Sequence, residues 1–251
     1  MDFSNPRQRA AFFEIHRDLP REGPGNRAST LRALALVGRL PGEPRVLDIA
    51  CGPGAQTLDL ATALPHASII ALDAHEPYLD QLHRRASAAG LADRIQPILG
   101  DMTALDFPPG SFDLIWCEGA AYIMGVPKAL RAWMRLLRPG GRIALTEAIW
   151  LRPDPPPPVL ANWREYPTMG DVPGVRAWFE AAGYGLLGDF ILPEEAWWTG
   201  YYGPMEARLD AIAGCFEGDA DAQIVLSEAR FEIDCYRQYS EFFGYAFFVA
   251  S

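Results

Sequence analysis

The residues with the clearest chemical potential lie between positions 46 and 57. A hydrophobic run contains Asp48 near its end, and a glycine-rich turn with Gly52 and Gly54 follows it and opens a helical pattern. Glycine lets the main chain approach a ligand closely, and the first N–H groups of a helix have no partner within the helix. We therefore expect a nucleotide-type ligand at this corner. The acid four residues before Gly52 suits a cationic ligand, and Thr57 stands where a dinucleotide-binding motif has its third glycine.

Further acids follow the later strand-like segments. These hydrophobic segments alternate with helical patterns and span residues 67–72, 95–99, 112–116 and 142–146. The alternation predicts parallel strands joined by helical crossovers. Ligands of such sheets bind beyond the carboxyl ends of the strands, where Asp48, Asp73, Asp101 and Glu118 should converge. An acid at Asp73 can accept both hydroxyls of a ribose, although NAD enzymes place an acid similarly.

The order and spacing of these segments resemble the class I S-adenosylmethionine (SAM) dependent methyltransferases. Residues 46–57 resemble motif I of that family, and the turn at 136–141 matches it in order and spacing. The resemblance implies an α/β fold: a doubly wound, seven-stranded, mostly parallel, Rossmann-like sheet. We expect its sixth strand over residues 184–192 and its last strand over 244–250, antiparallel beside the sixth.

The resemblance also implies a set of residues around SAM and its product S-adenosylhomocysteine (SAH). Asp48, Gly52 and Gly54 are expected at the methionine end. Asp73 is expected at the ribose, whereas Asp101 and Met102 match the adenine-contacting segment. The remaining donor-site candidates are Gly25, Ala50, Gln56, Thr57, Ala74, Gly100, Cys117 and Glu118.

Catalytic candidates follow the fourth strand. Glu118 can hold an amine, remove a proton from a hydroxyl or carbon acid, or bind the SAM amino group, although the dipole of a following helix also favours an acid there. Tyr122 either bonds to the acceptor or only packs, and His16 is the one histidine expected to reach the site. Further acceptor-binding candidates are Tyr122, Glu147, Trp150, Trp197 and Tyr201. Their aromatic rings suit a flat or cationic acceptor but are equally typical of a core.

The chain is expected to form a single domain over residues 1–251. Residues 1–40 are predicted to be N-terminal capping helices, which either close over the donor or only cover the sheet. Residues 150–171 and 193–243 are predicted substrate lids, with helices over about 205–216 and 222–243. The proline run at 154–158 predicts an extended connector.

Composition excludes several classes of function. With 251 residues, of which 49% are hydrophobic, the chain can bury a full core. Its formal net charge of −10 argues against nucleic-acid partners. The absence of a signal pattern and of a long apolar run predicts a cytoplasmic protein without membrane contact. Four dispersed cysteines favour neither a metal site nor a disulfide framework. Whether the chain forms a homodimer stays open.

The predicted function is SAM-dependent methyl transfer to a small-molecule acceptor by in-line displacement, with Glu118 orienting or deprotonating the acceptor. Residues 23–25, 116–122 and 191–197 make the chain similar to bacterial small-molecule methyltransferases of the ubiquinone/menaquinone type. Two other readings stay open: an NAD(P)-dependent oxidoreductase and a non-catalytic SAM-binding regulatory partner. Transfer of a different group from a modified SAM is also compatible with the sequence.

Overall fold

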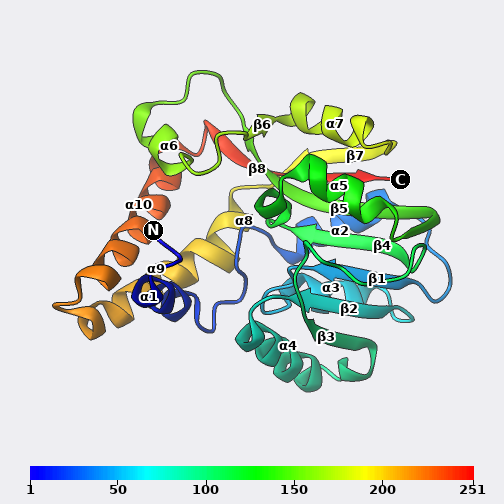
Figure 1. Cartoon of the computed structure of the whole chain (residues 1–251), viewed down its shortest axis with the longest axis horizontal. Helices are drawn as coiled ribbons and strands as arrows, with labels where there is room; N and C mark the ends of the chain where they lie inside the picture. The colour runs from blue at the N-terminus through cyan, green and yellow to red at the C-terminus, as the bar shows by residue number, and fades with distance from the viewer.

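A single twisted sheet forms the centre of the molecule in the computed structural model, which describes residues 1–251 (Figure 1). Its order is β3-β2-β1-β4-β5-β8-β7, with β6 paired to β5 outside this path. The strands are β1 (Arg45–Ile49), β2 (Ser68–Asp73), β3 (Ile95–Leu99), β4 (Phe112–Glu118), β5 (Leu137–Trp150), β6 (Gly170–Asp171), β7 (Leu186–Ile191) and β8 (Phe243–Ala250). Because β8 runs antiparallel to both β5 and β7 while the other pairings are parallel, the predicted doubly wound, mostly parallel sheet is confirmed.

Helices cover both faces of the sheet. They are α1 (Pro6–His16), α2 (Arg27–Val37), α3 (Ala55–Ala63), α4 (Glu76–Ala88), α5 (Val126–Met134), α6 (Pro157–Asn162), α7 (Val172–Ala181), α8 (Glu195–Trp197), α9 (Gly203–Ile212) and α10 (Ala220–Tyr239), with short turns η1 (Ala92–Arg94), η2 (Ala121–Met124), η3 (Trp198–Tyr202) and η4 (Ala213–Phe216). Buried residues of α2, α3 and α4 share one hydrophobic core, and those of α5 and α7 share the other. The strands are therefore buried from two sides, which is typical of parallel sheets.

The strand β5 is longer than the sequence pattern predicts. β5 extends over fourteen residues, and its second half pairs with β8 from Ile143 with Ala250 to Trp150 with Phe243. All eight residues of β8 are buried. The eighth strand, β6, consists of only two residues that pair with the end of β5. A strand of two residues is too short to be recognised from a hydrophobic pattern in the sequence.

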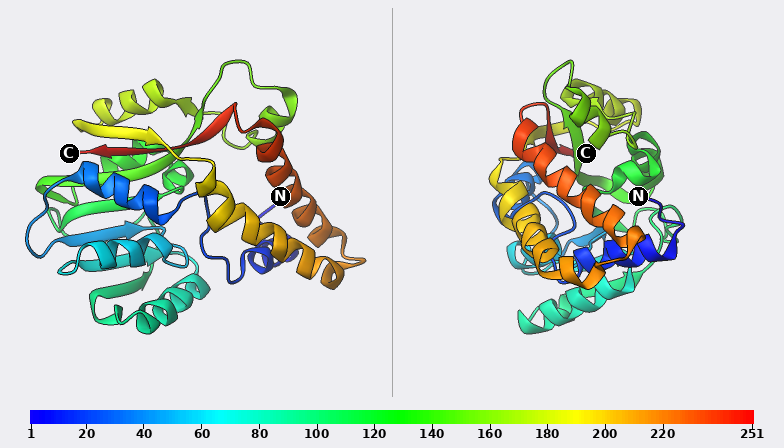
Figure 2. Two further views of the ribbon diagram at one scale, coloured as in Figure 1. Left: turned by 180° about the vertical axis from the view of Figure 1, so that it is seen from behind. Right: turned by 90° about the vertical axis from the view of Figure 1, so that its left-hand side faces the viewer.

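A helical layer stands beyond the carboxyl ends of the strands. Figure 2 shows α9 and α10 extending away from the sheet, with the N-terminal helix α1 beside them. α1 packs against both α9 and α10, so the first and last parts of the chain form one layer. The second of these lid helices begins at Ala220 because Asp219 caps it: the Asp219 carboxylate accepts the Ala222 N–H at 3.0 Å.

The starts of two helices depend on side chains and prolines. Asn26 caps α2, since its side chain accepts the Ser29 N–H at 2.8 Å. The proline run does not stay extended to its end, because Pro157 and Pro158 form the first turn of α6. Proline is tolerated in the first turn of a helix, where its missing N–H has no partner to lose. None of the helices combines the length and apolar composition that crossing a membrane requires.

Candidate active site

The glycine-rich turn links β1 to α3 through an unusual backbone. Ala50, Gly52 and Gly54 have φ angles of 56°, 53° and 84°, all in the left-handed region. A Cβ at Gly54 would overlap the Leu82 side chain of α4, so this position requires glycine for space as well as conformation. α3 begins at Ala55, and its N-cap residue Gly54 provides no side-chain cap. Its first N–H groups are therefore available to a ligand at the turn.

Asp48 lies under this turn and ties it to α3. Its carboxylate accepts the Thr57 hydroxyl at 2.6 Å and the Gln56 amide at 3.3 and 3.4 Å, and the same amide donates to the Cys51 carbonyl at 3.0 Å. Asp48 is fully buried, and burial raises its pKa to about 7. The structure thus unites Asp48, Gln56 and Thr57 in one network that holds the shape of the turn.

Asp73 occupies the tip of the neighbouring strand. Its two carboxylate oxygens accept the N–H groups of Gly52 at 2.8 Å and His75 at 2.9 Å. The side chain is 9% exposed, and burial raises its pKa although these two bonds oppose the shift. The Asp73 carbonyl also accepts the Gly100 N–H at 2.9 Å, which joins the ends of β2 and β3. Asp73 is therefore fixed beside the glycine-rich turn with little freedom to rotate.

The adenine-side candidates form an open rim. Asp101 and Ala74 are exposed, and Met102 is half-buried. Hydrogen bonds from Thr103, the backbone one at 2.7 Å, lower the pKa of Asp101. The His75 ring is half-buried and stacks on Phe13 with the ring centroids 3.7 Å apart. The N-terminal helix thus supplies an aromatic ring beside this rim.

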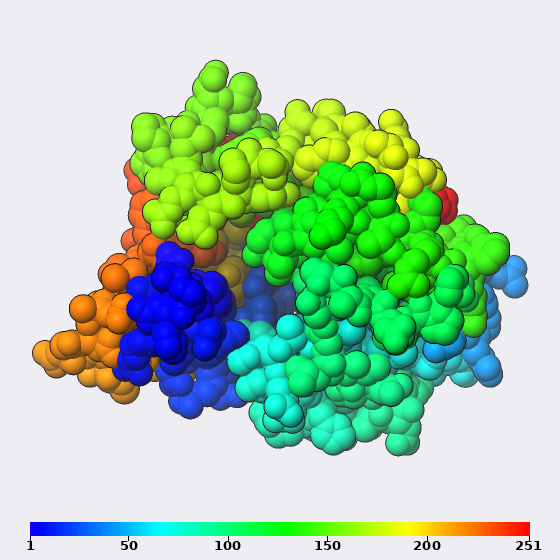
Figure 3. Space-filling view, in the orientation of Figure 1, coloured from blue at the N-terminus to red at the C-terminus, as the bar shows by residue number.

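The segment between α1 and α2 is tied to both the turn and the lid. Arg85 of α4 donates to the carbonyls of Leu19, Pro20 and Pro53 at 3.0 to 3.1 Å. Farther along, the Gly25 N–H donates to the Ala196 carbonyl of the lid at 2.9 Å. Figure 3 shows a hollow between the blue α1, the cyan α4 and the green η2 region, next to this segment. The N-terminal segment therefore lies where it can close over a ligand at the strand ends.

Glu118, at the end of β4, also contacts the segment between α1 and α2 through Arg21. Its carboxylate accepts the Arg21 guanidinium, the Thr30 hydroxyl at 3.2 Å and the Trp116 indole N–H at 2.8 Å. The side chains of Arg21 and Glu118 are 7% and 5% exposed. Burial raises the pKa of Glu118, and Arg21 opposes the shift. The predicted catalytic carboxylate is thus fully occupied, and its role toward an acceptor stays a prediction.

His16 belongs to a second cluster that sequence reasoning did not assemble. Its Nδ1 lies 2.6 Å from one Glu22 oxygen, which also accepts the Tyr78 hydroxyl at 2.7 Å. The other Glu22 oxygen is buried without a partner. Glu22 packs over Gly52, since its Cγ lies 3.2 Å from where a Gly52 Cβ would stand. The cluster joins α1, α4 and the glycine-rich turn. The polar group next to the His16 ring is therefore the Glu22 carboxylate of the chain itself.

The predicted acceptor-binding aromatics differ in exposure. Trp197 is 2% exposed and stacks on Tyr236 with the ring centroids 4.0 Å apart. Tyr201 is 7% exposed, and its hydroxyl lies 3.5 Å from the Glu232 carboxylate, which also accepts from Tyr202 at 2.9 Å. Both rings pack within the lid core. Tyr122, in contrast, belongs to η2 and is 41% exposed.

Glu147 stands on β5 without a hydrogen-bond partner for either carboxylate oxygen. It is 1% exposed, and burial raises its pKa to about 8. The neighbouring Tyr166 hydroxyl is the one side chain that opposes this shift. The rings of Tyr166 and Tyr122 lie 5.4 Å apart. Burying a carboxylate without a hydrogen-bond partner costs free energy, and such groups are rare in folded proteins.

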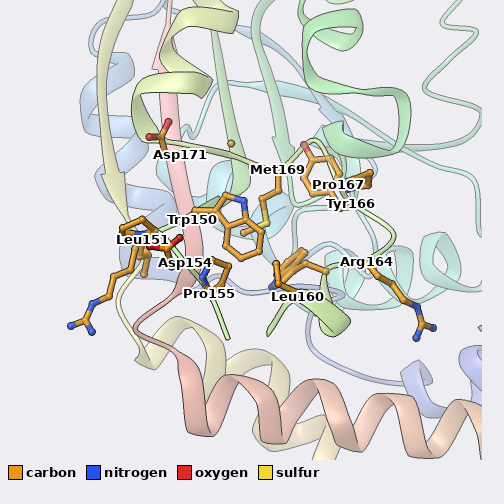
Figure 4. A pocket seen from close by; sticks show the side chains of 14 residues that line it. Trp150, Leu151, Asp154, Pro155, Leu160, Arg164, Tyr166, Pro167, Met169 and Asp171 are labelled. Atoms are coloured by element: carbon orange, nitrogen blue, oxygen red, sulfur yellow. The ribbon is translucent and has the colours of Figure 1, made fainter. Parts of the chain in front are cut away.

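A cavity of about 760 Å³ lies beyond the end of β5 (Figure 4). Its aromatic and apolar wall includes Trp150, Trp163, Tyr166 and Met169. In Figure 4 the rings of Trp150 and Tyr166 lie on either side of Met169, and the charged end of Arg164 points away from the cavity. None of the residues of the glycine-rich turn lines it. The cavity is thus a separate space that borders the strand ends through Tyr166.

Known proteins resemble the chain in both sequence and fold. Residues 46–141 match a family described as "Methyltransferase domain". Nocamycin O-methyltransferase from Saccharothrix syringae is 36% identical over 138 residues, which cover 53% of this chain and 45% of that protein. Demethylmenaquinone methyltransferase from Symbiobacterium thermophilum is 36% identical over 110 residues, which cover 43% of each chain. The chain therefore spans less than half the length of these curated relatives.

Solved structures resemble the chain over nearly its whole length. A SAM-dependent methyltransferase from Geobacter sulfurreducens, crystallised in complex with SAH, superimposes with a TM-score of 0.81. The match covers 98% of both chains at 24% sequence identity. At this identity the likeness shows the fold, which is that of the class expected from the sequence.

Proposed function

Because residues 46–141 form a methyltransferase domain and the chain has the fold of the class I SAM-dependent methyltransferases, we propose that it transfers the methyl group of SAM to a small-molecule acceptor. The single observation that carries this proposal is the corner between β1, α3 and β2. There, an uncapped helix start, two left-handed glycines and the buried Asp73 surround one place. Both curated relatives named above are methyltransferases of small molecules by their names.

The residues of this corner fit the donor. SAM supplies a methyl carbon on a positively charged sulfur, together with an amino acid end and an adenosine end. We place the amino acid end at the backbone of Gly52 and Gly54, next to Glu22, which packs over Gly52. Asp73 would accept the ribose hydroxyls, and the rim at Asp101 and Met102 would border the adenine. In this proposal SAM reaches all of these residues without any rearrangement of the strands.

Two predicted donor residues receive a supporting role in this proposal. Asp48 is buried beneath the turn and shapes it through Gln56 and Thr57, so it acts on the donor through the backbone that it holds. Glu118 was predicted to orient or deprotonate the acceptor. Its bonds to Arg21, Thr30 and Trp116 support a different task, which is to hold the N-terminal segment against β4. A role as proton acceptor would require the contact with Arg21 to open.

Alignment and exclusion of water are the chain's main contributions to an in-line displacement. The N-terminal segment contributes to both, because Arg85 ties it to the turn and Gly25 ties it to the lid. The lid contributes a dry wall through its packed aromatic rings. No proton transfer is required for the bond change itself; it is required only where the acceptor carries a proton on its nucleophile.

The two rival functions are less well supported. A nicotinamide-dependent oxidoreductase would share the acid at Asp73, but Thr57 replaces the third glycine and the family match is to methyltransferases. Absorbance of NADH bound to the purified protein would support that rival. A non-catalytic SAM-binding partner would share the donor corner. Release of labelled methyl groups to a small-metabolite extract would exclude it.

Calorimetric titration of SAH tests the proposal. We expect SAH to bind the wild-type chain and Asp73→Ala to weaken it at least tenfold, because hydrogen bonds to a charged group contribute roughly 1.5–3 kcal/mol each. Asp73→Asn, which keeps one oxygen acceptor, should lie between them. Asp93→Ala removes an exposed acid of η1, just before the start of β3, and serves as the control. Equal SAH affinity in wild type and Asp73→Ala would remove Asp73 from the site.

A further inference from the structure

The cavity beyond β5 borders one buried polar group without a hydrogen-bond partner and is separated from a second by the side chain of Tyr166. One is the indole N–H of Trp163, which belongs to the cavity wall. The other is the carboxylate of Glu147, next to the hydroxyl of Tyr166, whose side chain also belongs to the wall. Buried polar groups are nearly always hydrogen-bonded in folded proteins. Two exceptions around one cavity indicate that something other than the chain satisfies them.

Glu147 is the stronger of the two signals. Its side chain is 1% exposed, and no arginine, lysine or histidine contributes to its titration. The buried cation Arg21 is already paired with Glu118. An isolated charge in such a place costs several kcal/mol, which a cation from outside would offset. Without a cation beside it this buried carboxyl group therefore holds its proton, and a cation in contact with it would favour the ionised form.

Tyr166 connects this carboxylate to the cavity. It lies in the irregular segment between α6 and β6, and it is half-buried. Its hydroxyl is the polar neighbour of Glu147, and its ring lines the cavity together with Trp150 and Trp163. Rotation of this single side chain would open Glu147 to a molecule in the cavity. The ring would then stand beside the cation, where aromatic faces are attractive.

We propose that this cavity binds the apolar body of the methyl acceptor and that Glu147, reached past Tyr166, binds the acceptor's protonated amine. The assignment rests on the proposed methyl-transfer function and names its substrate class. A volume of about 760 Å³ is within the usual range for small-molecule sites. An anionic acceptor would place a second acid against Glu147, and a neutral alcohol would provide no charge that favours its ionised form. A protonated amine offsets the charge of Glu147 in its ionised form and also donates the hydrogen bonds that its two oxygens lack.

Three probes with one skeleton separate these classes: 2-phenylethylamine, 2-phenylethanol and phenylacetate. Each is titrated into the SAH-saturated full chain at neutral pH and followed by calorimetry and by ligand-observed NMR. The amine is expected to bind at least tenfold more tightly than the alcohol, and phenylacetate to bind most weakly. In Glu147→Gln the preference for the amine should disappear while the affinity for 2-phenylethanol stays the same. The unchanged alcohol affinity would show that the variant keeps its cavity.

Two further variants locate the site and test specificity. Leu160 lines the cavity and is 52% exposed, so Leu160→Trp should fill part of the cavity and weaken the amine and the alcohol alike. Glu165→Gln removes an exposed acid next to Tyr166 and should leave the amine preference intact. Equal binding of all three probes to the wild type, or an amine preference that survives in Glu147→Gln, would overturn the assignment. SAH binding is measured on the same samples: its absence would contradict the proposed function, whereas SAH binding without amine preference contradicts this inference alone.

Discussion

The unpaired carboxylate of Glu147 should make the stability of the fold depend on pH in a way that one substitution removes. The pKa of Glu147 rises from 4.5 to about 8 on folding, because burial disfavours the charged form. The folded chain therefore binds this proton more tightly than the unfolded chain. The corresponding stability is fully present below about pH 4.5 and is lost as the pH rises toward 8.

The magnitude follows from these two values. Each unit of pKa difference corresponds to about 1.4 kcal/mol, so between pH 5 and pH 8 the titration of Glu147 should reduce the free energy of unfolding by about 3 kcal/mol. Glutamine does not titrate. The difference in stability between Glu147→Gln and wild type should therefore grow by about 3 kcal/mol over this range. The unpartnered amide of glutamine adds an offset, but that offset is the same at every pH.

Urea unfolding at pH 5, 6, 7 and 8 measures this difference, with free energies obtained by linear extrapolation. Other buried acids, including Asp48, titrate in both proteins and cancel in the comparison. Glu241→Gln, which alters an acid that is 53% exposed in an ion pair with Arg152, is the matched control and should show no such trend. A difference between Glu147→Gln and wild type that stays constant within about 0.5 kcal/mol would refute the reasoning, because Glu147 would then titrate alike in both states.

Three further predictions concern the donor corner and its cover. Gly54→Ala should destabilise the fold by more than about 2 kcal/mol and impair SAH binding, whereas Gly218→Ala, at a similar φ in open space, should cost only about 1 kcal/mol in thermal unfolding. Arg21→Ala should cost about 3–5 kcal/mol because it leaves Glu118 buried and unpaired, and a double-mutant cycle with Glu118→Gln should recover a large part of that loss. For Asp48→Asn, with the pKa of the native acid raised to about 7, the stability difference from wild type should grow by about 2 kcal/mol between pH 5 and pH 7; a pH-independent difference in urea unfolding would contradict the buried titration.

The strand ends were readable from the sequence because they depend on local pattern. Hydrophobic runs and the glycines at 52 and 54 predict where β1 stops and α3 starts. The topology of a parallel sheet then brings Asp73 and Glu118 to the same edge without any knowledge of contacts. The doubly wound fold follows from the same alternation of elements. These features need only neighbouring residues and a rule of chain connection.

The partners of these residues were not readable, because they come from distant parts of the chain. Arg21 and Glu118 are separated by 97 positions, and nothing near either residue signals the other. The cluster of His16, Glu22 and Tyr78 likewise needs α1 to cross over α4. The missing partner of Glu147 is a property of the packed structure alone. Sequence reasoning named Glu147 as an acceptor-side candidate but could not distinguish a solvated acid from a buried one.

A crystal structure of the chain grown with SAH would locate the donor. SAH is expected at the turn between β1 and α3, with its ribose hydroxyls on the Asp73 carboxylate and its sulfur facing the hollow between α1, α4 and η2. SAH bound elsewhere, or a donor corner that stays empty at saturating SAH, would contradict this placement.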